Sequence, residues 1–142
     1  MPGTMTAEEV IEFVNEQRNA IIATVRKNGA PHTAWNPVAY VDNALYAYAD
    51  PASVCYRNLV GSRRASLAVA LGNRAIFIEG IAKEKARVNE VIGTLLAKIF
   101  SVVENWIPKN SYNYSSLLDC KASIFDIKIE KILTYKESVQ HI

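Results

Sequence analysis

The sequence predicts a mainly β protein, an antiparallel barrel of about six strands with flanking helices, in a single domain spanning residues 1–142. Short β-branched and apolar segments alternate with tight-turn residues, and one long stretch with a helical period precedes the last of them. The length of 142 residues is that of one ordinary domain. Hydrophobic residues make up 50% and charged residues 21%, which indicates a folded chain rather than a disordered one.

The first element should be a short helix from about Ala7 to Gln17. Thr6 and Glu9 have the spacing of a capping box, in which each side chain satisfies a backbone N–H of the other residue. The apolar residues of the helix cluster on one side; they are Val10, Ile11, Phe13 and Val14. We expect this helix to be a lid over the mouth or flank of a sheet rather than a core element.

Two strands should follow the first helix. Ala20–Val25 is a β-branched run, and the Asn28–Gly29 pair after it is typical of a hairpin turn with positive φ at both residues. The next segment runs from near Pro31 to Val41. Because Pro37 cannot donate to a ladder, this segment should lie at an edge, bend or carry a bulge.

A second turn, at Asp42–Asn43, leads into a third antiparallel strand, Leu45–Ala49. Its alternation places Leu45, Ala47 and Ala49 on one face, and Tyr46 and Tyr48 on the other. A short helix from Val54 to about Val60 is expected next, with Ser53 as its N-cap and Gly61 as its C-cap.

The second half of the chain should add three strands and the longest helix. The strands are Ala65–Leu71, Ala75–Lys85 after a Gly72–Asn73 reversal, and Ala122–Tyr135. Val88–Trp106 has a wide apolar helical face, Pro108 ends it, and a polar loop from Lys109 to Ser116 follows. A barrel then closes by pairing distant strands.

Composition and spacing exclude several functional classes. Sixteen basic and fourteen acidic residues give a net charge of +2, too weak and dispersed for nucleic acid or an anionic membrane. We find no apolar stretch of membrane-spanning length and no secretory leader, and therefore expect a cytoplasmic protein. Cys55 and Cys120 lack the spacing of a zinc or dithiol site, and His32 and His141 lack triad partners. We expect neither a metal site nor a catalytic side chain.

From Ile22 to Tyr135 the chain resembles the pyridoxamine 5'-phosphate oxidase-like, FMN-binding split-barrel family. The stretches that carry the resemblance are Ala23-Thr24-Val25, Asn28-Gly29-Ala30-Pro31-His32, Asn43-Ala44-Leu45-Tyr46, the block from Ser53 to Ala70, and Glu79-Gly80-Ile81-Ala82. The resemblance implies a homodimer of split barrels with two FMN sites at the subunit interface, each built from both chains. It also implies a flavin-dependent oxidoreductase, whose small-molecule substrate the sequence leaves unknown.

The family resemblance also implies positions for the cofactor. The flavin ring edge would meet the backbone of Ala34, Trp35, Asn36 and Pro37, and Tyr48 and Ala49 would border the ribityl chain. The phosphate would sit at the start of the short helix, at Ser53, Val54 and Cys55. Arg57, or Arg74 of the partner subunit, would supply positive charge.

The chain departs from the family pattern at two places. Family members commonly carry Arg or Lys directly after the serine, whereas this chain has Val54 and Cys55, so up to two charge-assisted phosphate bonds are missing. Residues 134–142 lack the basic and aromatic tail with which true pyridoxamine phosphate oxidases hold their substrate, so we do not expect that enzyme. Two alternatives stay open: a flavin-free binding or stress-associated module of the same fold, and an enzyme that uses deazaflavin or haem.

Overall fold

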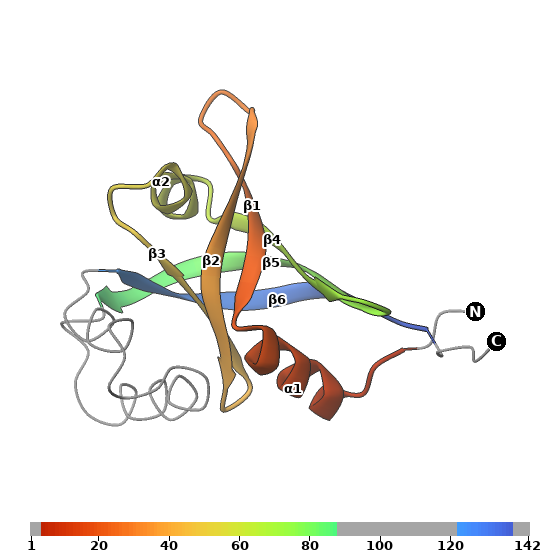
Figure 1. Cartoon of the computed structure of the whole chain (residues 1–142). Helices are drawn as coiled ribbons and strands as arrows, with labels where there is room; N and C mark the ends of the chain where they lie inside the picture. The colour runs from red at the N-terminus through yellow and green to blue at the C-terminus, as the bar shows by residue number, and fades with distance from the viewer. Residues whose placement is uncertain (1–3, 88–121, 138–142) are drawn as a thin grey trace.

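The computed structural model describes residues 4–87 and 122–137. In this part of the chain six strands close a barrel, and two helices lie on opposite sides of it (Figure 1). The elements are α1 (Ala7–Gln17), β1 (Asn19–Val25), β2 (Pro31–Val41), β3 (Ala44–Ala49), α2 (Val54–Gly61), β4 (Arg64–Leu71), β5 (Arg74–Arg87) and β6 (Ser123–Lys136). The predicted mainly β barrel is confirmed. The predicted helix at 88–106 and loop at 109–116 lie outside the described residues.

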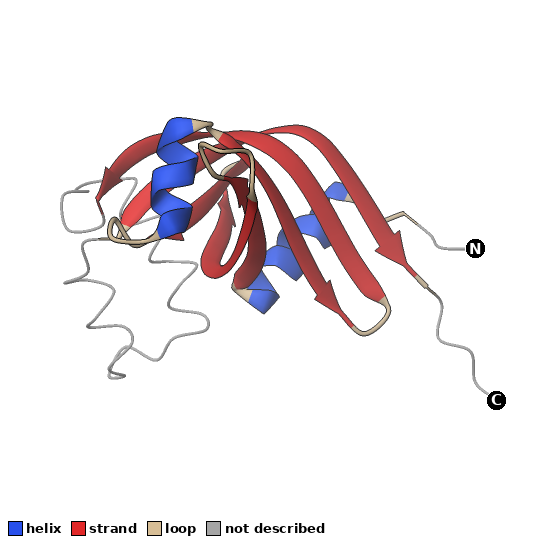
Figure 2. Cartoon of the chain, turned by 90° about the horizontal axis from the view of Figure 1, so that it is seen from above, coloured by secondary structure: helices blue, strands red, loops and turns tan. Residues whose placement is uncertain are grey.

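The barrel consists of two three-stranded meanders joined along both edges. The strand order is β1-β2-β3-β6-β5-β4, with β4 returning to pair with β1, and all neighbours are antiparallel. Closure therefore depends on two pairings between strands distant in sequence, β1 with β4 and β3 with β6. Figure 2 shows the strands wrapping around the interior, with α2 crossing the outside of the barrel.

Strand β2 changes its partner in the middle. Residues 31–37 pair with β1, whereas residues 38–41 pair with β3. Pro37 lies at the last β1 pair, and the N–H of Val38 donates to the Arg18 carbonyl at 2.8 Å. The proline therefore lies at an edge, so its missing N–H does not cost the sheet a hydrogen bond. The part of β2 that precedes Pro37 forms the β1–β2 hairpin, which projects from the barrel beside α2 (Figure 1).

The turn with two left-handed residues, predicted for the first hairpin, occurs at the second turn instead. Gly29 alone has a positive φ in the first turn, where its N–H donates to the Arg26 carbonyl, so the prediction for Asn28 is wrong. The Asn28 side chain accepts a hydrogen bond from the Ala30 N–H instead, at 3.0 Å. The doubly left-handed turn occurs at Asp42–Asn43, with φ of 50° and 62°, residue types that tolerate this conformation.

Helix α1 begins with the predicted capping box, but it is more than a lid. The N–H of Glu9 donates to Thr6 Oγ1 at 3.2 Å, and the N–H of Thr6 donates to Glu9 Oε1 at 3.4 Å. Phe13 and Val14 have no exposed surface and belong to the main hydrophobic cluster. The lid prediction is therefore wrong in part, because α1 covers the barrel and also completes its core.

Helix α2 ends one residue later than predicted. Gly61 is the last helical residue, the C-cap is Ser62, and neither has a positive φ. The left-handed residue that commonly follows a C-cap is Arg63, with φ of 65°. The predicted Gly61 C-cap is therefore wrong, and an arginine occupies a position usually filled by glycine.

The long β5–β6 ladder is closely packed at Gly80. The register shifts between Glu79 and Gly80. A Cβ at Gly80 would lie 2.5 Å from the Lys128 carbonyl oxygen and 2.9 Å from Cγ2 of Ile127. A side chain cannot be accommodated there, so the glycine allows β5 and β6 to pack together at this irregularity.

Candidate functional site

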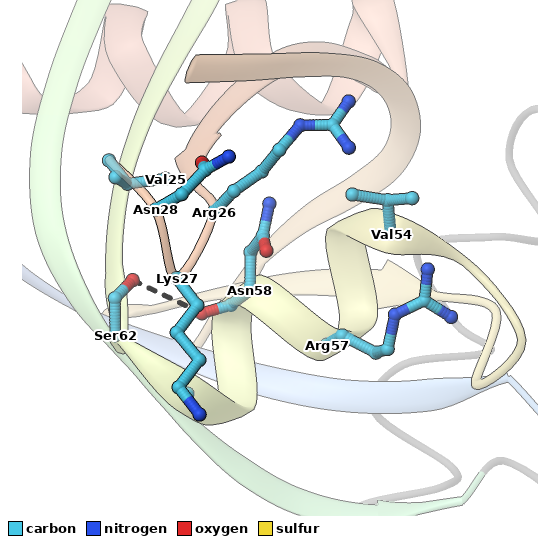
Figure 3. A pocket seen from close by; sticks show the side chains of 9 residues that line it. Val25, Arg26, Lys27, Asn28, Val54, Arg57, Asn58 and Ser62 are labelled. Atoms are coloured by element: carbon cyan, nitrogen blue, oxygen red, sulfur yellow. Dashed lines mark hydrogen bonds between the residues drawn. The ribbon is translucent and has the colours of Figure 1, made fainter. Parts of the chain in front are cut away.

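The projecting β1–β2 turn and one face of α2 enclose a pocket of about 870 Å³ (Figure 3). This volume is within the range of small-molecule sites. The residues that line this α2 pocket are Val25, Arg26, Lys27, Asn28, Val54, Arg57, Asn58, Gly61 and Ser62. Two segments about thirty residues apart in sequence therefore meet at one concave surface.

Three of the side chains around the α2 pocket are cationic. Arg26 and Lys27 come from the hairpin turn, and Arg57 comes from α2. In the view of Figure 3 the guanidinium groups of Arg26 and Arg57 lie on either side of Val54. None of the three forms an ion pair with a carboxylate among the described residues. The pocket therefore carries a positive potential that favours an anionic ligand.

The start of α2 is capped by Ser53, as predicted. Ser53 Oγ accepts a hydrogen bond from the Tyr56 N–H at 3.1 Å and donates to the Asp50 carbonyl at 2.7 Å. The hydroxyl is thus fully engaged in local structure. The backbone N–H groups of Val54 and Cys55 are not used by this cap, so they are the groups of the first turn that could meet an anion.

Replacing Ser53 with Ala should lower the free energy of unfolding by about 1 kcal/mol, because the Tyr56 N–H loses its capping partner. Chemical denaturation measures this loss, and Ser66→Ala, at an exposed serine of β4 that does not line the α2 pocket, is a matched control. If the hydroxyl serves only as a cap, anion affinity should be unchanged under conditions where both proteins are folded. A large loss of affinity would show instead that the hydroxyl is also a ligand.

Positions 54 and 55 face different surroundings. Val54 lines the α2 pocket, whereas Cys55 is buried and accepts a hydrogen bond from Asn36 Nδ2 to its Sγ at 3.4 Å. Burial raises the pKa of the Cys55 thiol, which opposes formation of a thiolate, while the Asn36 hydrogen bond acts in the other direction. Cys55 therefore joins α2 to β2, and its side chain does not reach the pocket.

Tyr48, at the end of β3, has a hydroxyl that is buried without a hydrogen-bond partner. Burial raises the pKa of this phenol strongly, and the neighbouring Tyr46 adds to the effect. The alternation predicted for β3 holds for its inward residues, since Leu45, Ala47 and Ala49 all belong to the core cluster. An unsatisfied buried hydroxyl costs free energy, so Tyr48 is a candidate for contact with a polar ligand atom.

The four predicted residues on β2 do not share one surface. Asn36 points toward α2, and Ala34 packs against the core cluster. Trp35 and Pro37 are exposed, Trp35 with 75% of its surface accessible. Because successive strand residues face opposite sides, one ligand can follow this segment only along its backbone.

Arg74 lies on the α1 side of the barrel, remote from α2 within the same chain. Its Nη1 is 3.8 Å from Glu16 Oε2, and its guanidinium lies 4.5 Å from the centre of the Phe13 ring. The charge that Arg74 is expected to supply to the phosphate concerns the FMN site of the partner subunit.

Sequence reasoning missed the residues that complete the α2 pocket and hold α2 in place. The sequence places Asn28 in a turn and predicts no role for Arg26 or Lys27, yet all three line the pocket. Asn58 is buried and donates from Nδ2 to Thr24 Oγ1 at 3.0 Å, which ties α2 to β1. Further along, Tyr56 Oη and Ser123 Oγ both donate to Glu84 Oε2, at 2.8 and 2.5 Å. No local pattern signals such contacts between distant segments.

An apolar row crosses the outer surface of five strands. In register order it consists of Trp35, Ile21, Ala68, Phe77 and Leu133. Four of these side chains are large and exposed: Trp35 to 75%, Ile21 to 53%, Phe77 to 46% and Leu133 to 58%. A contiguous apolar surface of this kind is typical of a protein interface.

Residues 4–87 and 122–137 contain neither a candidate metal cluster nor a helix that could span a membrane. Within these ranges no three His, Cys, Asp or Glu side chains are arranged to hold a metal ion. Neither α1 nor α2 has the length and apolar character that a helix needs to cross a membrane.

Comparisons with known proteins agree on the fold. The family model described as pyridoxamine 5'-phosphate oxidase matches residues 6–134. No curated protein sequence matches the chain significantly.

Three solved structures are similar to the chain over nearly its whole length. The conserved hypothetical protein Rv2991 from Mycobacterium tuberculosis is 20% identical, with a TM-score of 0.73, and the match covers 96% of this chain and 93% of that one. The FAD-binding protein from Mesorhizobium loti is 22% identical, with a TM-score of 0.65 and coverages of 97% and 99%. The haem storage protein HutZ from Vibrio cholerae is 14% identical, with a TM-score of 0.71 and coverages of 91% and 94%. At these identities the likeness concerns the fold alone.

Proposed function

Because the chain belongs to the pyridoxamine 5'-phosphate oxidase family, we propose that it binds FMN and acts as a flavin-dependent oxidoreductase on a small molecule other than pyridoxamine phosphate. The observation that carries this proposal is the gathering of Arg26, Lys27 and Arg57 around a pocket that includes the first turn of α2. A phosphate monoester placed there gains charge-assisted hydrogen bonds and meets free backbone N–H groups.

The described residues fit a flavin nucleotide in two further respects. The hydroxyl of Tyr48 is buried without a partner, and a polar cofactor atom would satisfy it. The backbone N–H groups of Val54 and Cys55 are available at the start of α2. Arg57 and the hairpin cations would hold the phosphate, and the β2 segment from Ala34 to Pro37 would border the ring through its main chain.

We place the flavin site at the interface of a homodimer. The solved structures named above include an FAD-binding and a haem storage protein of the same fold, so this architecture can hold planar cofactors. The exposed apolar row includes Trp35 of β2, the strand proposed to border the flavin ring. A second copy packed on this row would cover apolar surface and bring its own residues, Arg74 among them, toward the ring.

Bound flavin supplies hydride transfer, so the chain need not provide an acid or base for the redox step. The roles left to the protein are to hold the phosphate through cations, to fix the ring edge through main-chain groups, and to exclude water. The neutral thiol of Cys55 contributes to this rigidity by packing against Asn36 beneath α2.

Titration of the purified chain with FMN tests the proposal. We expect saturable quenching of flavin fluorescence at or below tens of micromolar, and at least a tenfold weaker affinity for Arg57→Gln, because that change removes a charge-assisted bond. Arg64→Gln is the matched control, since Arg64 pairs with Glu130 outside the α2 pocket. No quenching, or an equal loss in both variants, would refute phosphate binding in this pocket.

A flavin-free module of the same fold is the second candidate. The specific observation in its favour is that Ser53 Oγ is fully engaged in the cap while position 54 lacks a charged side chain. The absorption spectrum of the protein as purified separates the candidates: flavin bands support the oxidoreductase and a Soret band indicates haem. A featureless spectrum, together with no quenching of the fluorescence of added FMN, supports the flavin-free module.

A further inference from the structure

A second concave site lies on the barrel wall formed by β3, β6 and β5. It is a groove of about 560 Å³ that shares no lining residue with the α2 pocket. Four cationic side chains, Arg63, Lys83, Lys85 and Lys128, line this basic groove together with one carboxylate, Asp126. Tyr40, Asn43 and apolar residues of β3, β5 and β6 form the rest of its surface.

The charges of the basic groove do not balance internally. Lys85 Nζ lies 3.9 Å from Asp126 Oδ2, and this pair accounts for the one carboxylate. Arg63, Lys83 and Lys128 form no ion pair with a carboxylate among the described residues. Like charges gathered in a concavity repel one another, and a bound anion relieves that repulsion.

The backbone of Arg63 gives a second, independent observation. Arg63 has φ of 65° directly after the C-cap of α2, a conformation that glycine adopts without steric cost and arginine does not. Its Nε donates to the Ala82 carbonyl at 3.3 Å, which holds the guanidinium at the groove. The backbone conformation alone would favour glycine, so an arginine here indicates a use for its side chain.

We propose that the basic groove binds a small organic anion that carries phosphate or carboxylate groups. Arg63, Lys83 and Lys128 contact the anionic oxygens, and the apolar wall receives the uncharged part of the molecule. The groove is separate from the flavin pocket, so this binding does not depend on the proposed function. It gives the protein a second ligand site on the same barrel.

Titrating the full chain with pyrophosphate, and separately with citrate, at constant ionic strength tests the proposal. Backbone amide NMR shifts should be saturable at low millimolar ligand and should centre on Arg63, Ile81–Lys85 and Lys128. Either anion binding in this way supports the site, and the tighter one identifies the phosphate or carboxylate class. Absence of saturation with both anions, or shifts spread equally over exposed lysines such as Lys136, would overturn it.

Three variants make the test specific. The double variant Lys83→Gln/Lys128→Gln should bind the preferred anion at least tenfold more weakly and leave FMN affinity unchanged. Arg63→Gly should also bind more weakly, while its melting temperature is not lowered, because glycine relieves the left-handed strain. Arg18→Gly is the matched control: Arg18 has φ of 71° at the end of α1 but does not line the groove. Anion affinity that falls equally in Arg18→Gly would contradict the proposal.

Discussion

Substituting Val54 with Arg should tighten FMN binding roughly tenfold to a hundredfold. Val54 lines the α2 pocket beside Arg57, so a guanidinium there can add a charge-assisted bond to the phosphate. Such a bond contributes about 1.5–3 kcal/mol, and each 1.4 kcal/mol is about a factor of ten in affinity. Fluorescence titration with FMN, with riboflavin as the phosphate-free comparison, measures the gain.

Val60→Arg is the matched control for this gain. Val60 is exposed on α2 but does not line the pocket, so the same added charge should leave FMN affinity nearly unchanged. An equal gain in both variants would indicate general attraction of an anion to a more basic protein. No gain for Val54→Arg would remove the first turn of α2 from the phosphate site. Riboflavin affinity should change in neither variant.

A basic residue cannot be introduced in the same way at Cys55. The sequence suggested that Val54 and Cys55 together replace two basic residues, yet Cys55 is buried against Asn36. A lysine there would place a charge among core residues and destabilise the fold rather than strengthen binding. In an eight-residue helix with mixed apolar and polar residues, the sequence does not fix which of two adjacent positions faces the barrel.

Local signals predicted the elements of this fold well. The capping box of Thr6 and Glu9 and the N-cap Ser53 act within three residues, and both appear as expected. Strand alternation likewise identified the inward residues of β3. The errors lie where neighbouring residues can each adopt the left-handed conformation. In the first hairpin turn Gly29 alone adopts it, and after α2 it is Arg63 rather than Gly61 that does so.

The candidate site was harder to predict because it is assembled through space. Arg26 and Lys27 meet Arg57 only because the projecting β1–β2 hairpin folds beside α2. The basic groove likewise joins Arg63 to residues of β5 and β6. Such juxtapositions follow from barrel closure, a long-range event that hydrophobic periodicity does not encode. The family resemblance predicts a phosphate site at the start of α2 with Arg57 beside it, and the structure places Arg26 and Lys27 around the same pocket as Arg57.

Introducing a charge within the apolar row should dissociate the proposed homodimer. Phe77 lies between Ala68 and Leu133 in register, and 46% of its surface is exposed in the single chain. In a two-fold symmetric interface, Phe77→Lys buries two ammonium groups without partners. We expect the dissociation constant to rise at least a hundredfold, which corresponds to about 2.7 kcal/mol.

Sedimentation measurements over a range of protein concentrations follow this change, and Val60→Lys, exposed on α2 and outside the row, is the matched control. The melting curve of a Phe77→Lys monomer should retain a cooperative transition, because the substituted side chain faces outward from an intact barrel.

If each flavin site is built from both chains, FMN affinity falls together with dimerisation and recovers at concentrations where the variant still associates. A wild-type monomer, or a Phe77→Lys dimer of undiminished affinity, would contradict the interface. FMN bound equally well by monomer and dimer would instead confine the cofactor to the pocket between α2 and the β1–β2 turn of one chain.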